Sequence, residues 1–152
     1  MTRSLAALVL LCGTAVAGDL RIVDGDSIVL DGQRIRLFGV DAPERNQTCQ
    51  GHDGSVYECG RDATTVLREL TANRTVTCTP RDRDRYGRIV AVCTADGKDI
   101  GAEMVRRGWA TDYARYSHGA YAVQERAARD EGLGMWSGRF TMPAEWRKEH
   151  RR

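Results

Sequence analysis

Residues 24–44, DGDSIVLDGQRIRLFGVDAPE, constrain the fold of this chain more than any other stretch. Two Asp-Gly pairs, the second at Asp31-Gly32, are typical of tight turns and separate short apolar runs. Pro43 disfavours a helical conformation at the residue before it and so ends the last run. The pattern predicts a meander of three strands, at residues 20–23, 28–30 and 33–40.

Carboxylates gather in the same stretch and would face one another across a pair of strands, at Asp24, Asp26, Asp41 and Glu44. Like charges held close together destabilise a fold unless a cation or a basic group neutralises them, so the pattern indicates a metal-binding site. Ile35 and Leu37 alternate with Arg36, which directs Arg36 toward a site on the other face of its strand. The alternative interpretation is that each aspartate occupies a turn, where Asp is common.

The composition is that of one soluble globular domain. Of 152 residues, 41% are hydrophobic and 29% are charged, which excludes both a disordered chain and a membrane protein. The net charge of +2 comes from 23 basic and 21 acidic side chains and does not by itself indicate a nucleic-acid-binding protein. Any basic binding site must therefore be local.

Residues 1–17 have the pattern of a secretory signal peptide. Arg3 precedes an apolar run at residues 5–11, and small residues lead to a cleavage position before Gly18. The apolar run is too short to span a bilayer. We expect export to the periplasm or the medium, with no membrane association once the signal is removed. Residues 18–138 would then form the folded domain and residues 139–152 a C-terminal tail.

Four cysteines remain once Cys12 leaves with the signal peptide. An even number in an exported chain indicates disulfides, and of the three possible pairings we favour Cys49–Cys59 and Cys78–Cys93. Buried free thiols are the alternative, and they would be more typical of a cytosolic protein. Zinc is not expected because the chain contains no CxxC pair.

Apolar spacing and turn residues predict three helices and two further strands, which gives five strands in all. The helices are expected at residues 60–72, 99–107 and 117–131, and the strands at residues 74–80 and 89–94. Ser117 is the expected N-terminal cap of the last helix. Three irregular segments are expected: an exposed, mobile loop at residues 45–58, an aromatic segment at 109–116 and a frayed, solvated end at 147–152. The fold class is α+β, mainly β with α.

Residues 81–88, RDRDRYGR, form a charged hairpin. Its acids loosely match the start of an EF-hand calcium loop, but Tyr86 and Cys93 stand where that loop needs acidic ligands, so we reject the match. The residues alone favour a solvated hairpin whose charges keep an edge strand soluble. The functional alternative is an arginine that reaches over the sheet to hold a phosphate, since a guanidinium is a permanent bidentate donor.

The aromatic segment at residues 109–116 has two interpretations. Its tyrosines offer stacking surfaces for bases, whereas aromatic residues beside a small sheet more often belong to the core. Tyr116 is therefore a candidate substrate-binding residue.

Five motifs, in order and at matching separations, resemble the thermonuclease family, which has the staphylococcal-nuclease-like domain. They are VDGDS at residues 23–27, RLFGVDAPE at 36–44, DRYGR at 84–88, VRRGWA at 105–110 and GLGMW at 132–136. The resemblance implies a five-stranded OB-fold barrel with three helices. It also implies a calcium-dependent phosphodiesterase that acts on DNA and RNA. We expect a monomer that favours single-stranded or unpaired regions.

The resemblance implies a set of calcium ligands. These would be the carboxylates of Asp26 and Asp41 and the backbone carbonyl of Ala42, with Asp24 supporting them. Many family members have Thr where this chain has Ala42. A main-chain ligand survives that change, but whatever the hydroxyl group adds is lost.

The resemblance also implies catalytic roles. Glu44 would orient or deprotonate the attacking water, while Arg36 and Arg88 would bracket the scissile phosphate. Arg85 and Tyr86 would contact another phosphate of the nucleotide. Phosphodiester cleavage needs fixed positive charge around the phosphoryl oxygens and a base for water on the side opposite the leaving group, which agrees with these roles.

The alternative function is a non-catalytic OB-fold module that binds nucleic acid or a protein partner. Such a descendant would be expected to lose part of the catalytic set. This chain retains all of it: Asp26, Arg36, Asp41, Glu44 and Arg88. The sequence therefore predicts an exported calcium-dependent nuclease.

Overall fold

The main sheet of the computed structural model, which describes residues 18–150, is built from five strands and one short addition. The strands run β1-β2-β3-β8-β7 across the sheet, and only the β3/β8 pair is parallel. They are β1 (Leu20–Ile22), β2 (Ser27–Leu30), β3 (Gln33–Leu37), β7 (Val76–Arg83) and β8 (Ile89–Ala95), with β9 (Lys98–Asp99) paired to β8. The predicted meander and the five-stranded sheet are confirmed.

The turn between β2 and β3 has the geometry that Asp-Gly favours. Asp31 and Gly32 both have positive φ, 49° and 77°, as a tight hairpin turn requires. The predicted third strand was too long, because the chain turns at Gly39, where φ is +67°. After that turn, β4 (Val40–Asp41) pairs with β10 (Thr111–Asp112) instead of continuing β3. This change of direction carries Asp41 away from the main sheet.

The three predicted helices are present, together with shorter ones. They are α1 (Cys59–Thr71), α2 (Ile100–Arg106) and α4 (Ala122–Asp130), joined by α3 (Ala114–Ser117), a 3-10 helix η1 (Gly134–Ser137) and α5 (Pro143–Glu149). The carboxylate of Asp99 caps α2 by accepting a hydrogen bond of 3.0 Å from the backbone N–H of Ala102.

The segment before α4 differs from the sequence prediction in two ways. Residues 109–116, expected to be irregular, include β10 and the start of α3. Ser117 does not cap the last helix: its hydroxyl accepts a hydrogen bond from Gly119 N–H, and the helix begins only at Ala122. His118 has a φ of 54°, which reverses the chain between α3 and α4.

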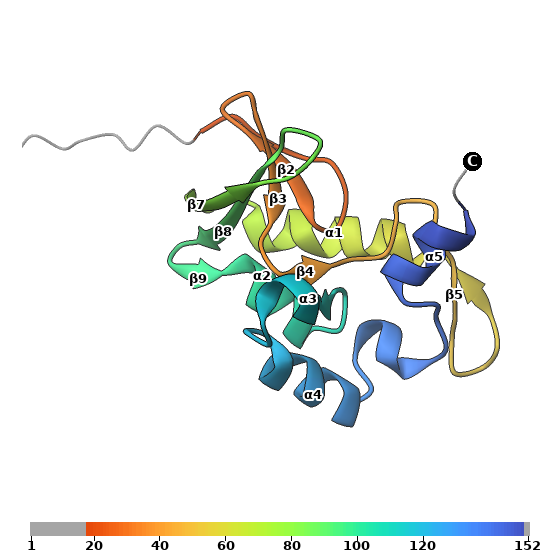
Figure 1. Cartoon of the computed structure of the whole chain (residues 1–152). Helices are drawn as coiled ribbons and strands as arrows, with labels where there is room; N and C mark the ends of the chain where they lie inside the picture. The colour runs from red at the N-terminus through yellow and green to blue at the C-terminus, as the bar shows by residue number, and fades with distance from the viewer. Residues whose placement is uncertain (1–17, 151–152) are drawn as a thin grey trace, which may run out of the picture.

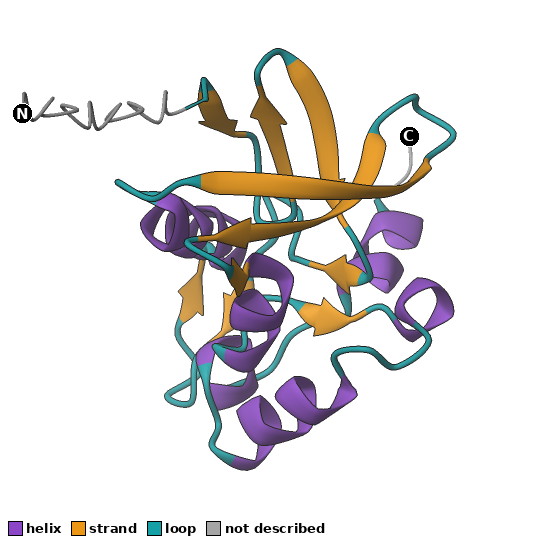
Figure 2. Cartoon of the chain, turned by 90° about the vertical axis from the view of Figure 1, so that its left-hand side faces the viewer, coloured by secondary structure: helices purple, strands orange, loops and turns teal. Residues whose placement is uncertain are grey.

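The core lies between the sheet and the helices. Figures 1 and 2 both show the strands of the main sheet on one side of the molecule and most of the helices beneath them. The fully buried side chains of the core come mainly from β2, β3, α1 and α2 and include Ile28, Leu37, Leu67, Met104 and Val105. Burial of such side chains contributes roughly 1.5–3 kcal/mol each. This burial holds in place the part of the sheet that carries Asp26 and Arg36.

Both predicted disulfides are present. Cys78 and Cys93 face each other across β7 and β8, and Cys49–Cys59 ties β5 (Cys49–Gln50) to the start of α1. Both bonds fit an oxidising environment. The predicted signal peptide, residues 1–17, lies outside the described residues. Within residues 18–150, no helix combines the length and the apolar character needed to cross a bilayer.

Candidate active site

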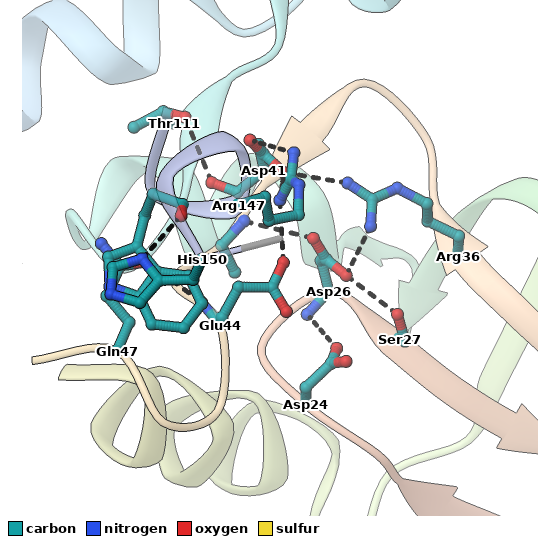
Figure 3. Close-up of polar contacts among 12 residues, drawn as sticks. Asp24, Asp26, Ser27, Arg36, Asp41, Glu44, Gln47, Thr111, Arg147 and His150 are labelled. Atoms are coloured by element: carbon teal, nitrogen blue, oxygen red, sulfur yellow. Dashed lines mark hydrogen bonds and ion pairs between the residues drawn. The ribbon is translucent and has the colours of Figure 1, made fainter. Parts of the chain in front are cut away.

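A buried pair of aspartates clamped by one arginine forms the centre of the candidate site (Figure 3). Asp26 precedes β2 and is 4% exposed, and Asp41 on β4 is 2% exposed. Arg36 on β3 donates from Nη1 to Oδ1 of Asp26 and from Nη2 to Oδ1 of Asp41, each at 3.0 Å. Because the strand register pairs Ser27 with Arg36, the guanidinium lies beside the first residue of β2. The structure thus brings together three of the predicted site residues.

Asp26 is held by further donors that fix the neighbouring backbone. Its Oδ1 accepts a hydrogen bond of 2.9 Å from the Ser27 hydroxyl, and its Oδ2 accepts one of 3.2 Å from the backbone N–H of Ala42. The Ala42 side chain is buried in the core. The peptide at Ala42 therefore lies directly beside the Asp26 carboxylate, where a main-chain ligand is expected.

Asp24 supports this arrangement from the turn before β2. Its carboxylate accepts a hydrogen bond of 3.1 Å from the backbone N–H of Asp26. Burial, and then the charge of Asp26, raise the pKa of Asp24 to about 6. Asp24 therefore lies beside Asp26 and holds the backbone at that residue.

Arg147, on α5, is the functional residue that sequence reasoning missed. Its Nη1 donates to Oδ1 of Asp41 at 2.8 Å and to Oε1 of Glu44 at 2.9 Å, and its Nη2 donates to Oδ2 of Asp41 at 3.0 Å. The prediction of a frayed, solvated end at residues 147–152 was therefore wrong over residues 147–149, which belong to a helix. Pro143 at the first position of that helix was the available sequence signal.

The charges in this network shift one another's pKa values. Burial raises the pKa of Asp41, and the opposing effect of Arg147 and Arg36 does not cancel it. Burial alone would lower the pKa of Arg147, but its hydrogen bonds and charge pairing with Asp41 and Glu44 outweigh burial and raise it. Asp26 and Asp41 similarly raise the pKa of Arg36 against the effect of burial. Both arginines are therefore firmly charged.

Arg88 reaches the same site from the charged hairpin. Its Nε donates to Oδ2 of Asp84 at 2.7 Å, and its Nη1 donates to the hydroxyl of Ser27 at 3.2 Å. That hydroxyl in turn donates to Asp26. The hairpin is thus more than solvated surface, because it places a second guanidinium beside the aspartate pair.

The candidate substrate-binding residues lie on the surface. Tyr86 is 61% exposed, and its ring faces the guanidinium groups of Arg85 and Arg88 at 4.9 and 5.7 Å from its centroid. Tyr116 is 54% exposed and packs edge-on against Tyr113. Within residues 18–150, no hydrogen bond or ion pair joins Tyr116 to the charged network.

The loop at residues 45–58 is more ordered than predicted, because it contains β5 paired with β6 (Val56–Tyr57) and a buried glutamine. Gln47 is fully buried: its Oε1 accepts a hydrogen bond of 3.2 Å from the backbone N–H of Glu44, and its Nε2 donates to the carbonyl of Thr141 at 2.7 Å. Gln47 therefore connects the backbone of Glu44 to the C-terminal segment. No local sequence pattern marks it, since its partner Thr141 is 94 residues away.

Gly60, at the start of α1, allows the backbone of Glu44 to approach closely. A Cβ atom at this position would overlap the carbonyl oxygen of Glu44, a backbone atom that cannot rotate away. Gly60→Ala is therefore expected to lower both the melting temperature and the activity of the site, because the strain falls on the backbone that carries Glu44. Gly101→Ala in α2 is the comparison, since its Cβ would meet only side-chain atoms at 3.2–3.3 Å. Equal behaviour of the two variants in thermal unfolding and activity would contradict this prediction.

The donor set fits a hard divalent cation. Within residues 18–150, no three His, Cys, Asp or Glu side chains converge on one point. However, the carboxylates of Asp24, Asp26, Asp41 and Glu44 are balanced only by Arg36 and Arg147, since Arg88 pairs with Asp84. The remaining negative charge and the oxygen-only donors suit calcium. Asp26, Asp41 and the carbonyl of Ala42 would hold the ion.

Comparison with known proteins identifies the family to which this chain belongs. Residues 34–138 match the family model described as staphylococcal nuclease homologue. The chain belongs to the staphylococcal nuclease family.

Several curated relatives are similar over most of this chain. An uncharacterized endonuclease of Escherichia coli is 36% identical over 148 residues, which cover 93% of this chain and 90% of the relative. The succinoglycan biosynthesis protein ExoI of Rhizobium meliloti (strain 1021) is 38% identical over 123 residues, 80% of this chain but 64% of the relative. The staphylococcal-like nuclease CAN1 of Arabidopsis thaliana is 30% identical, over 91% of this chain and 41% of the relative.

Proposed function

We propose that this chain is an exported, calcium-dependent nuclease that hydrolyses phosphodiester bonds in DNA and RNA. The observation that carries the proposal is the convergence of two arginines beside one acidic pair, Arg36 from β3 and Arg88 from the hairpin before β8. Arg36 contacts Asp26 directly, and Arg88 contacts the Ser27 hydroxyl beside it. Membership of the nuclease family and the endonuclease names of relatives support the same reaction.

The two arginines suit the charge that develops during cleavage. Negative charge builds up on the phosphoryl oxygens, and a guanidinium offers paired N–H donors and a permanent positive charge to them. Arg36 and Arg88 would approach the phosphate from β3 and from the hairpin that leads into β8. Calcium, when bound, supplies further positive charge to a phosphate oxygen and a site for the attacking water.

Glu44 is the proposed residue that orients or deprotonates the attacking water. Its carboxylate lies next to Asp41, because Arg147 contacts both side chains. Its backbone is held by Gln47, so the carboxylate extends from a fixed peptide. A positioned carboxylate typically contributes a factor of about 10²–10⁴ as a general base.

The surface residues suit an unpaired nucleic-acid strand. Tyr86 and Tyr116 present exposed rings for bases, and Arg85 lies over the ring of Tyr86. Export is supported by the two disulfides and by the signal pattern of residues 1–17. We propose that the mature protein acts as a monomer in the periplasm or the medium.

A digestion assay tests this function. The purified mature chain is expected to cleave denatured DNA and RNA in calcium and to lose that activity when EGTA removes the ion. Undiminished cleavage in EGTA would contradict the metal assignment. Binding of the nucleic acid without cleavage in calcium would instead support the non-catalytic binding module.

A further inference from the structure

Arg147 occupies the carboxylates on which the proposed reaction depends. Its guanidinium binds both oxygens of Asp41, a proposed calcium ligand, and one oxygen of Glu44, the proposed base. The side chain is 31% exposed, so these are partly buried, geometrically well-defined ion pairs rather than loose surface contacts. Figure 3 shows Arg147 between the two carboxylates.

A calcium ion would compete with Arg147 for these oxygens. With Arg147 bound to both oxygens of Asp41 and Arg36 bound to one of them, an incoming calcium ion would meet two guanidinium charges at close range. Arg147 also occupies one oxygen of the Glu44 carboxylate, which opposes the proposed role of that carboxylate in orienting a water molecule. The network as it stands is therefore an inactive arrangement of the proposed site.

The attachment of α5 allows Arg147 to leave. Within residues 18–150, the only hydrogen bonds and ion pairs that link a side chain of α5 to the rest of the protein are those of Arg147. In contrast, the residues just before α5 are held firmly. Arg139 exchanges two backbone hydrogen bonds with Gln50, and the Thr141 carbonyl accepts the Gln47 amide. Pro143, the first residue of α5, is buried, so movement would be confined to the part of the helix that follows it.

The helix lies beyond the residues that the family model matches. The family match ends at residue 138, and α5 begins at Pro143. Figure 1 shows α5 beside β5, at the end of the molecule where the disulfide-linked loop lies. An arginine supplied from outside the matched domain to its acidic centre is an arrangement suited to control rather than to the core chemistry.

We propose that Arg147 is an internal cation that closes the site, and that calcium displaces it together with α5. This inference rests on the proposed function, because it takes Asp41 as a calcium ligand. Binding of the metal then exchanges one positive group for another at Asp41, frees Glu44 from its ion pair and opens the site to a nucleic-acid strand. The cost of breaking the Arg147 ion pairs lowers the apparent affinity for calcium.

Calorimetric titration of the full mature chain with calcium, without nucleic acid, tests the exchange. Arg147→Gln is expected to bind calcium about tenfold more tightly than the wild type, the size expected for the loss of a partly buried ion pair. Lys148→Gln is the matched control, because it removes the same charge from an exposed neighbour on the same helix. Its calcium affinity should match that of the wild type.

Tryptophan fluorescence provides a second measurement that does not depend on activity. Trp146 adjoins Arg147 and stacks on His150 with the ring centroids 4.0 Å apart, so displacement of α5 changes its surroundings. Calcium should change the emission of the wild type. The change should be absent from Trp146→Phe and much smaller in Arg147→Gln.

The outcomes separate this inference from the proposed function. If the wild type binds calcium and Arg147→Gln binds it with unchanged or lower affinity, the exchange is overturned. The nuclease proposal then still stands. Reduced cleavage by that variant at unchanged calcium affinity would also overturn the exchange, by making Arg147 a positioning residue for Glu44. If neither protein binds calcium, both the calcium site and the exchange are refuted.

Discussion

Glu44→Gln is expected to reduce the rate of phosphodiester cleavage by about 10³-fold without unfolding the protein. Glutamine has almost the same shape, and its side-chain oxygen can still accept the hydrogen bond that Arg147 donates to Glu44. The backbone hydrogen bond to Gln47 does not involve the side chain of residue 44 at all. The geometry of the site is thus preserved, while the group that would take a proton from water is lost.

The measurement is kcat on denatured DNA at saturating calcium, with the circular dichroism spectrum and melting temperature as checks of folding. Glu69→Gln is the matched control: it makes the same chemical change at an exposed position on α1, outside the charged network. The control should keep full activity. A folded Glu44→Gln variant within tenfold of the wild-type kcat would remove Glu44 from the mechanism.

Local patterns predicted the parts of the site that lie close together in the sequence. The Asp-Gly turn at Asp31 and the alternation in β3 determine which face Arg36 occupies, and both are properties of a few neighbouring residues. Asp26 and Asp41 were found for the same reason. Asp26 lies just before β2 and Asp41 on β4, just after β3, so Arg36 on β3 can contact both carboxylates.

Distant partners explain what the sequence did not predict. Arg147 meets Asp41 across 106 residues. Pro143 marks the start of a helix there, but it does not distinguish Arg147 from the other basic residues of the C-terminal segment. Arg88 is a similar case, because the charged hairpin alone resembles ordinary surface. It reaches Ser27 only because β8, which follows it, pairs in parallel with β3.

The boundaries of the helices also depend on contacts that the local sequence pattern does not reveal. Ser117 has the residue type of a helix cap, yet its hydroxyl is used in a turn with Gly119. Gly39 packs closely here: a Cβ at that position would lie 2.7 Å from the Cβ of Ser117. Tertiary packing of β4 against this segment therefore decides the role of Ser117, and propensity alone could not show it.

Arg36→Met is expected to destabilise the calcium-free protein by about 3–5 kcal/mol, the usual cost of removing one partner from a buried charge pair. Arg36 is the residue that joins Asp26 and Asp41, whose side chains are 6% and 2% exposed. Methionine fills much of the same volume but neutralises neither carboxylate. Urea unfolding, followed by the far-ultraviolet circular dichroism signal, measures the loss.

Calcium should restore much of the stability of Arg36→Met, because a divalent cation at Asp26 and Asp41 replaces the missing positive charge. Arg34→Met, two positions earlier on β3 and exposed, is the matched control and should unfold like the wild type in the presence and absence of calcium. Activity should stay low in Arg36→Met even when calcium restores its fold, since the guanidinium proposed to contact the phosphate is gone. Recovery of both stability and full activity would show that Arg36 serves only to neutralise the two aspartates.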